Sequence, residues 1–254
     1  MKTLRMVATL ALLCVPLAAA AATSADEAIA GLIASLKDAG SRPGSQPDAA
    51  TAIPLLERLR PHLTGSSHRM VESMLRAAQA ARLHDETARK ALGPALAKQD
   101  GYVPAAAALG PFIAFALPLA TLTHGSSAEI AERSSAGDDV LYRVRWLANA
   151  GGERERVEEI FIAVREAGSW KLLVPGFGSS TIGSRTRGGV TENYMEREQK
   201  PWSAAAMRGE NEAAQRKIDD LAGLFDSMTS EVKAGRFRNP KAYVDAIAAR
   251  AQRM

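Results

Sequence analysis

The chain has 254 residues, with 32 Lys and Arg against 28 Asp and Glu, a formal net charge of +4 and only 5% aromatic residues. Charges of both signs are spread along its length, so we expect no nucleic-acid partner, because such a partner needs a concentrated basic face. Cys14 is the only cysteine, which excludes an internal disulfide and a cluster of thiolate metal ligands.

The first 22 residues have the pattern of a cleavable secretory signal peptide. Lys2 and Arg5 form a short positive segment, residues 6–17 are apolar, and alanines at 18–22 supply the small residues that a signal peptidase recognises. An uncleaved anchor helix is the alternative, but the apolar stretch is short for a membrane span. We therefore predict that residues 1–22 are removed on export.

Cleavage after Ala20 or Ala22 would remove Cys14 and leave a mature chain without thiols. A lipoprotein signal needs a small residue directly before the cysteine, whereas Leu13 stands there, so we do not expect lipidation. The type of signal predicts the periplasm of a Gram-negative bacterium as the location of the protein.

Residues 23–100 are predicted to form a helical region. Ser24 and Glu27 fit a capping box at the start of the first helix, and apolar residues then recur at helical spacing. Proline and glycine mark the breaks between helices. The expected helices run from Ser24 to Gly40, over about 48–63, over about 67–83, and from Asp85 to a point before Pro94.

Residues 101–123 contain no charged residue, which raises the alternative of a membrane span. Pro104, Pro111 and Pro118 argue against a regular span, because each removes a backbone hydrogen-bond donor. We predict a buried, broken helix pair. A pocket-lining or lipid-contacting role lies between these two interpretations.

From about residue 128 the pattern changes to the alternation that is typical of strands. In the second strand, Tyr142, Val144 and Trp146 fall on one face and two arginines fall on the other. Trp170 opens the last strand after a glycine turn, and we expect its large apolar side chain to close one end of the sheet. The expected strands cover about residues 128–134, 139–148, 154–165 and 170–174.

The fold class that these patterns predict is α+β. A curved antiparallel sheet of three to four strands, at about residues 128–175, would pack on helices, with helical regions before and after it. In chain order the expected regions are a signal peptide (1–22), a helical region (23–100), a sheet region with the apolar broken helix (101–178), a Gly- and Arg-rich loop (179–200) and C-terminal helices (201–254).

The C-terminal region contains an apolar stripe at helical spacing that runs from Ala214 to Val232. Packing within its own domain is the simplest interpretation of this stripe, and a homodimer seam or a groove for a partner is the alternative. A last helix is expected from Asn239, its N-cap, and Pro240. The side chains expected at a dimer seam are Ile218, Leu221, Phe225 and Met228.

Helices followed by an antiparallel meander whose last strand contains GSWKL resemble the NTF2-like (cystatin-like α+β cone) superfamily. This resemblance rests on residues 128–175, and it implies a curved sheet wrapped around helices with a pocket at the open end. The stretch SWKLLVPGFGSS, followed by helices, is also similar in layout to periplasmic phospholipid carriers of the MlaC type. That second resemblance implies a lipid-like ligand.

Few residues are arranged for catalysis or metal binding. The four histidines lack metal-ligand spacing. His84, Asp85 and Glu86 are expected at a helix start, where acidic residues interact favourably with the helix dipole, and a metal or acid/base site is the alternative. The acids on or beside the sheet match no catalytic position of the family and are expected at edges or turns; they are Asp138, Asp139 and Glu158. We expect no catalytic residue, metal or cofactor, and an isomerase or hydrolase ranks last.

We therefore expect a periplasmic protein that binds a small apolar or lipid-like ligand without catalysing a reaction. The ligand would be buried between the concave face of the sheet and the apolar 105–122 segment. The candidate ligand-binding residues are Tyr142, Val144, Trp146, Phe161, Trp170, Arg185 and Arg187. Two points stay open: whether Phe161 and Trp170 share a face, and whether the two arginines contact an anion at a pocket mouth or lie in a plain linker.

The alternative function is that of a structural or protein-interaction protein. In that case the pocket would be filled by its own side chains, and the C-terminal amphipathic helix would be the partner or dimer surface.

Overall fold

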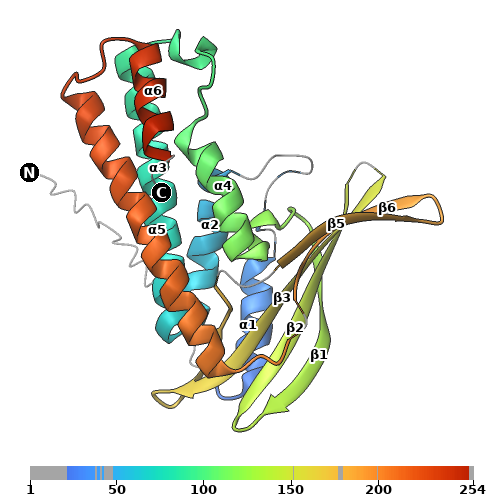
Figure 1. Ribbon diagram of the computed structural model, residues 1–254. Coiled ribbons are helices and arrows are strands. Elements are labelled where there is room, and N and C mark those ends of the chain that lie inside the picture. The colour runs from blue at the N-terminus through green and yellow to red at the C-terminus, as the bar shows by residue number, and fades with distance from the viewer. Residues whose placement is uncertain are drawn as a thin grey trace, which may run out of the picture.

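The chain has an α+β fold, which agrees with the class that the sequence predicts (Figure 1). The computed structural model describes residues 22–37, 39–40, 42, 48–150, 152–176, 180–198 and 200–251. The predicted signal peptide lies outside these residues except for Ala22, and so does Cys14. The described residues form a sheet of six strands, more than the three or four expected.

Helices precede and follow the sheet. The α-helices are α1 (Ala25–Leu36), α2 (Ala49–Leu59), α3 (Gly65–Leu92), α4 (Ala105–Ala116), α5 (Ala204–Lys233) and α6 (Pro240–Ala251). Two predicted N-caps are confirmed. The hydroxyl of Ser24 accepts a hydrogen bond from the N–H of Glu27 at 3.1 Å, and the side chain of Asn239 accepts one from the N–H of Ala242 at 2.9 Å.

The strands surround a long central strand, β3. They are β1 (Ser127–Ala136), β2 (Asp139–Ala150), β3 (Glu153–Glu166), β4 (Ser169–Leu173), β5 (Ser180–Arg187) and β6 (Val190–Arg197). β1 to β4 form the predicted antiparallel meander. One edge of β3 pairs with β2, and its other edge is shared: β6 pairs in parallel with Arg154–Glu158, and β4 pairs with Ile162–Glu166. The sheet is therefore mixed.

The prediction of a loop at residues 179–200 is wrong, because β5 and β6 form a hairpin there. Gly188 and Gly189 occupy the turn with φ of 58° and 78°. Two consecutive positive φ values match the right-handed twist of a tight hairpin, so these glycines permit the turn that joins two strands. β6 then pairs with β3, a contact between segments distant in sequence that local composition does not reveal.

The predicted break near Asp85 is also wrong, because α3 continues from Gly65 to Leu92. No glycine or proline interrupts it, and Gly93, at φ 72°, ends it. His84 and Asp85 are 0% and 4% exposed. They are polar residues on a buried face of one long helix.

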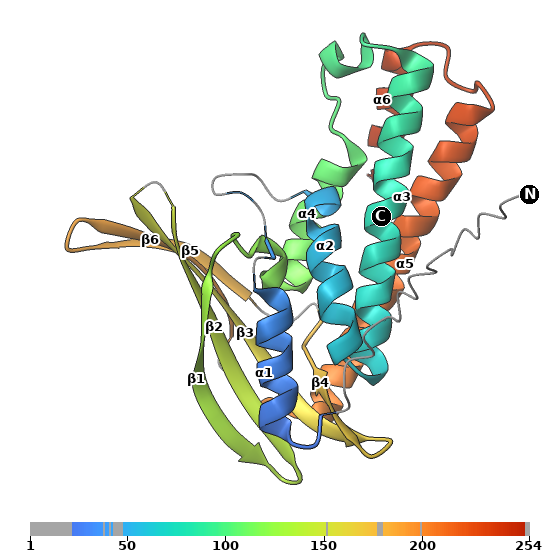
Figure 2. The same cartoon turned by 180° about the vertical axis from the view of Figure 1, so that it is seen from behind.

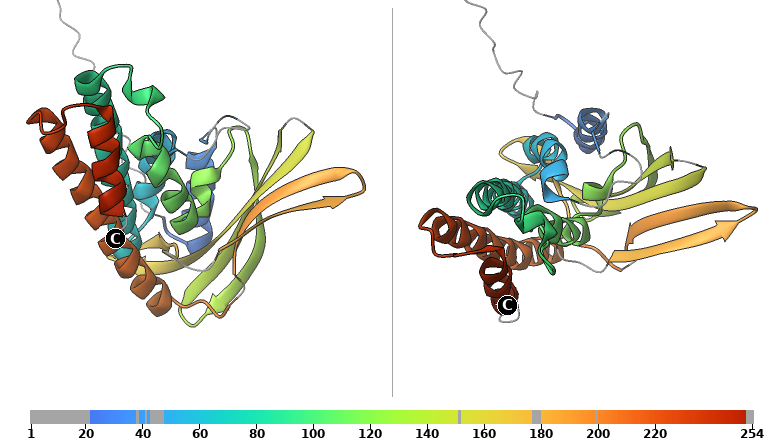
Figure 3. Two further views of the ribbon diagram at one scale, coloured as in Figure 1. Left: turned by 45° about the horizontal axis from the view of Figure 1, so that its top comes forward. Right: turned by 90° about the horizontal axis from the view of Figure 1, so that it is seen from above.

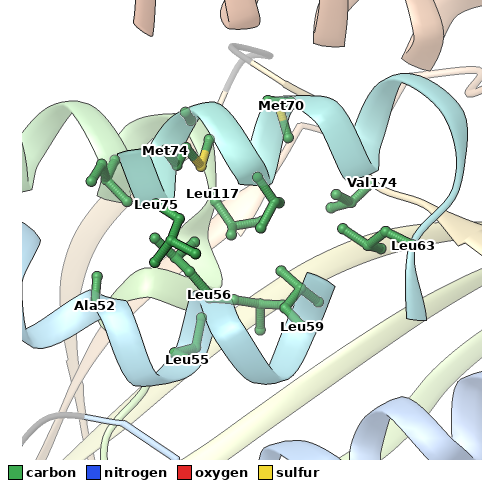
Figure 4. Close-up of a cluster of buried hydrophobic side chains, with 14 of the residues drawn as sticks. Ala52, Leu55, Leu56, Leu59, Leu63, Met70, Met74, Leu75, Leu117 and Val174 are labelled. Carbon is green, nitrogen blue, oxygen red and sulfur yellow. The ribbon is translucent and has the colours of Figure 1, made fainter. Parts of the chain in front are cut away.

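The concave face of the sheet packs on the N-terminal helices (Figure 2). Tyr142 of β2 lies opposite Phe161 of β3 in the register, and both side chains are fully buried. Behind them α2 and α3 enclose an aliphatic cluster (Figure 4) that includes Leu56, Leu59, Met70, Met74, Leu117 and Val174. This cluster is the middle of the main core.

The opposite face of the sheet carries a small second core and a row of ion pairs between Glu158 and three arginines, which we call the charged ladder. Ile160 and Ile162 pack with Trp202 and Met207, from the segment that leads into and begins α5. Beside them Arg143 contacts Glu158 at 2.8 Å, with both side chains at most 10% exposed. The alternation predicted for β2 and β3 is thus confirmed, but their second face is largely covered.

α3 and α5 run side by side in the same direction and extend away from the sheet (Figure 3). Near their start, Ser67 accepts a hydrogen bond from Asn211 and binds both backbone groups of Val174, at 2.9 and 3.0 Å. Near their other end a third apolar cluster joins them to α6; it contains Ala88, Leu96, Met228, Val232 and Tyr243.

The uncharged 101–123 segment agrees only in part with the predicted buried, broken helix pair, because α4 continues through Pro111, and Phe112 and Phe115 are 46% and 43% exposed. α4 ends at Ala116, and a 3₁₀ turn follows at Pro118–Thr121. Within the part of the chain that the structure describes, no helix combines the length and the apolar character that crossing a bilayer requires.

A fully buried ion pair holds the end of α4 on the sheet. The guanidinium of Arg197 contacts Glu159 at 2.8 Å, with both side chains 0% exposed. It also donates to the carbonyl oxygens of Ala116, Pro175 and Gly176. Burial raises the pKa of Glu159, and the opposite charge of Arg197 counteracts that rise.

Candidate functional site

An apolar groove with a volume of about 670 Å³ lies between α4 and α5, which both pack on α3. Helix α6 contributes to one end of it, and Figure 1 shows α4 facing α5 and α6. We refer to it as the α4–α5 groove. It is lined by His84, Val103, Ala105, Ala108, Leu109, Phe112, Lys217, Asp220, Leu221, Leu224, Phe225, Met228, Tyr243 and Ile247.

The groove is apolar because two helical stripes meet across it. On α4 the lining residues step by three and four from Ala105 to Phe112, and on α5 they do the same from Leu221 to Met228. This spacing places each set on one face of its helix. The small side chains of Ala105 and Ala108 leave space that larger residues would fill.

A neutral hydrogen-bonded chain occupies the end of the groove near α6. The hydroxyl of Thr229 donates to the carbonyl of Phe225 at 2.8 Å, so it accepts from Nδ1 of His84 at 3.1 Å. Nε2 of His84 then accepts from the hydroxyl of Tyr243 at 2.6 Å. Burial lowers the pKa of His84 to about 4, so the imidazole is neutral near pH 7.

Asp85, next to His84, positions the start of α4. Its carboxylate accepts hydrogen bonds from the N–H groups of Ala105 at 2.7 Å and Ala106 at 3.0 Å. Burial is the largest influence on its pKa and raises it, although these two bonds lower it. The predicted position of Asp85 at the start of its own helix is wrong, because Asp85 lies within α3 and caps α4, twenty residues further along the chain.

Charged and exposed residues border the groove. Lys217 and Asp220 line it on α5, and both are exposed. Phe112 on α4 is 46% exposed, and Val103, before the start of that helix, is 56% exposed. The groove is thus open to solvent along α4 and carries charge at the end far from the histidine.

The structure places four predicted ligand-binding residues in the main core. Tyr142, Val144, Trp146 and Phe161 are at most 2% exposed, and the rings of Trp146 and Phe161 are 6.3 Å apart. Tyr142 also donates a short hydrogen bond to Asp26 of α1. The sheet face around these four residues is packed against helices.

Trp170 shares the concave face with Phe161, which answers the question that the sequence left open. It lies opposite Arg165 in the register, on the same side of the sheet as Phe161, and packs on the main core. The backbone N–H of Trp170 donates to the backbone carbonyl of Ala22 at 3.1 Å. Its ring borders a cavity of about 200 Å³ near α1, separate from the α4–α5 groove.

Arg185 and Arg187 lie on β5, in the hairpin, and do not line the α4–α5 groove. Arg185 pairs with Glu192 of β6 and lies over the ring of Tyr194 at 5.7 Å. Arg187 stands opposite Val190 beside the turn. The structure therefore does not bring the two arginines together with the predicted aromatic set.

The residues predicted for a dimer seam lie on the buried face of α5. Ile218, Phe225 and Met228 are at most 7% exposed within the single chain, and Leu221 is half-buried. Packing within the domain, the simplest interpretation of the stripe, is confirmed. Leu221, Phe225 and Met228 also line the groove. These residues were identified from the sequence, but they were predicted as a dimer seam and not as a groove wall.

The acids on or beside the sheet differ in their surroundings. The prediction of an edge or turn position is wrong for Glu158, which lies on the central strand β3 and is buried among three arginines of the charged ladder. Asp138 is exposed in the turn between β1 and β2, as expected. Among the described residues no group of three or more His, Cys, Asp or Glu is placed to hold a metal ion.

Comparisons with protein-family models, with curated proteins and with solved structures find no match to this chain. The resemblances to NTF2-like proteins and to MlaC-type carriers therefore stay predictions. The geometry of the groove is the basis on which a function can be proposed.

Proposed function

We propose that this protein binds a small apolar or lipid-like molecule in the α4–α5 groove and does not convert it chemically. The observation that carries this proposal is an apolar groove of about 670 Å³, within the size range of small-molecule sites. We keep the periplasm as the proposed location, on the basis of the signal-peptide pattern in residues 1–22.

This proposal moves the binding site away from the concave face of the sheet. The apolar segment 105–122 keeps its predicted role as one wall, through Ala105, Ala108 and Phe112. The opposite wall becomes α5, because the side chains under the sheet are packed together. His84 is fully hydrogen-bonded and neutral, so it suits a non-catalytic wall better than an acid or base.

A fluorescent apolar probe tests the proposal directly. N-phenyl-1-naphthylamine should bind with increased emission, and Ala108→Phe should abolish this binding, because the new ring would fill the groove. Ala108 lines the groove and is exposed, so the substitution should leave the core intact. Ala213→Phe is the matched control, since Ala213 is an exposed residue of α5 outside the groove.

Equal probe binding by both variants would contradict the proposal. Native mass spectrometry of protein purified from the periplasm without detergent is a second test. An adduct of lipid mass that is present in the Ala213→Phe control and lost in Ala108→Phe would support binding in the groove.

The alternative proposal is a protein-interaction or dimer surface around α5. Its support is three exposed apolar side chains on or just before α4, Val103, Phe112 and Phe115, together with the half-buried Leu221 of α5. The same native spectra separate the two proposals. A dimer without adduct that becomes monomeric on Phe112→Ser would favour the alternative.

A further inference from the structure

We infer that the ligand of the α4–α5 groove is a single-chain amphiphile, a molecule with one unbranched acyl chain and one polar head, and not a two-chain lipid. This inference rests on the proposed function and specifies its ligand class. Three properties of the groove carry it: its volume, its length and the placement of its polar groups.

The volume matches one chain. At ~30 Å³ for each methylene-sized unit, close to the share of one water molecule in the liquid, a groove of about 670 Å³ holds on the order of twenty non-hydrogen atoms. That is the size of one acyl chain with part of its head group. The two tails of a common membrane phospholipid together exceed it, and because the groove is open along α4, part of their apolar surface would stay in water.

The length gives an independent estimate. The lining of α5 extends from Lys217 to Met228, which corresponds to ~16 Å at 1.5 Å per helical residue. A zigzag chain of ~1.5 Å bonds advances roughly 1.3 Å per carbon, so about twelve carbons span this distance. Volume and length therefore agree on one extended chain of medium length.

The polar groups set the direction of the chain. At the α6 end, both nitrogens of His84 are bonded, to Thr229 and to Tyr243. A ligand head group there would have to break these bonds, so this end suits the tail. The charged residues that line the groove are Lys217 and Asp220, at the other end. We place the polar head beside them, near solvent.

Displacement of the bound fluorescent probe tests the inference. Octanoate, decanoate, dodecanoate and tetradecanoate should displace it with affinities that rise about fourfold per added methylene up to about twelve carbons, as expected for burial of each group, and then level off. Dodecanoyl lysophosphatidylcholine should also displace it. Diheptanoyl phosphatidylcholine, with the same head group and two chains, should not displace it where the lysolipid saturates.

Each outcome has a distinct meaning. If diheptanoyl phosphatidylcholine displaces the probe as well as the lysolipid does, or if chain length has no effect, the inference fails while the proposed function stands. If the probe itself does not bind in a manner sensitive to Ala108→Phe, the proposed function fails. The mass of the adduct that co-purifies distinguishes a free fatty acid from a lysophospholipid.

Discussion

The carboxylate of Asp85 on α3 accepts a hydrogen bond from the backbone N–H of Ala105, the first residue of α4, at 2.7 Å. The residue before α4 is Pro104, and α4 has no side-chain cap from its own N-cap position. A residue of another helix therefore supplies the cap. Because α4 is one wall of the groove, this contact links the stability of the fold to the shape of the site.

Replacing Asp85 by Ala should lower the free energy of unfolding by about 1–2 kcal/mol, the cost of losing a helix cap. It should also weaken binding of the fluorescent probe, because the start of α4 loses its anchor. Chemical denaturation and probe titration measure the two effects. Glu86→Ala is the control, since Glu86 is exposed and pairs with Arg82 on the same helix surface; a similar loss in that variant would contradict the capping role.

His84 should make stability depend on pH. Burial lowers its pKa to about 4 in the folded protein, whereas the unfolded value is about 6.5. Between these values the unfolded chain binds the extra proton, so stability falls as the pH is lowered, at roughly 1.4 kcal/mol per pH unit for this group. Unfolding by urea at several pH values from about 7 to about 4 measures the slope.

The variant His84→Gln should lose this part of the slope, because glutamine keeps hydrogen-bonding groups but does not titrate. His68→Gln is the control, since the side chain of His68 is 38% exposed. An unchanged slope in His84→Gln would show that other groups cause the acid sensitivity.

The buried pair Arg197–Glu159 should show strong coupling. Arg197→Met leaves the carboxylate of Glu159 buried without its cation, which typically costs about 3–5 kcal/mol. The double variant Arg197→Met, Glu159→Leu should cost less than the sum of the two single changes. It should remain less stable than the parent, because three backbone carbonyls still lose their donor.

A double-mutant cycle of unfolding free energies measures this coupling. Lys241→Met, which breaks the exposed Lys241–Asp245 pair, should change stability little. Additive effects at Arg197 and Glu159 would refute the interpretation of the pair as a coupled buried unit.

Two substitutions in the β5–β6 turn should have different effects on the stability of the hairpin. Gly189 has φ of 78°, so Gly189→Val would force a β-branched residue into the left-handed region at a cost of about 1–2 kcal/mol. Gly188→Asn should be nearly neutral, because asparagine accepts that region. Hydrogen exchange of the β5 and β6 amides reports the difference, and equal protection in both variants would argue against the tight turn.

Much of the fold follows from short-range patterns. The alternation around Tyr142 and Trp146 predicted β2 correctly, and Ser24 and Asn239 marked two helix starts, because strand period and capping depend on neighbouring residues. The β5–β6 hairpin was missed. Most residues of β5 are polar and exposed, and the pairing of β6 with β3 joins distant segments.

The candidate site was recognised only in parts. The uncharged segment with Phe112 and the apolar stripe with Phe225 were both identified from the sequence, one as a pocket wall and the other as a packing or dimer surface. No local signal indicated that the two face each other. His84 and Asp85 were predicted at a helix start, since the continuity of α3 depends on the helices packed around it.

The sequence by itself determined the α+β class, the antiparallel meander, the uncharged segment at residues 101–123 and the apolar stripe of the C-terminal region. Only the tertiary structure decided where these parts meet: the aromatic face of the sheet packs against α1 and α2, and the groove lies between α4 and α5. The physical reason is that periodicity states which face of an element is apolar, whereas its partner is chosen by packing and by long-range bonds such as Asp85 to Ala105.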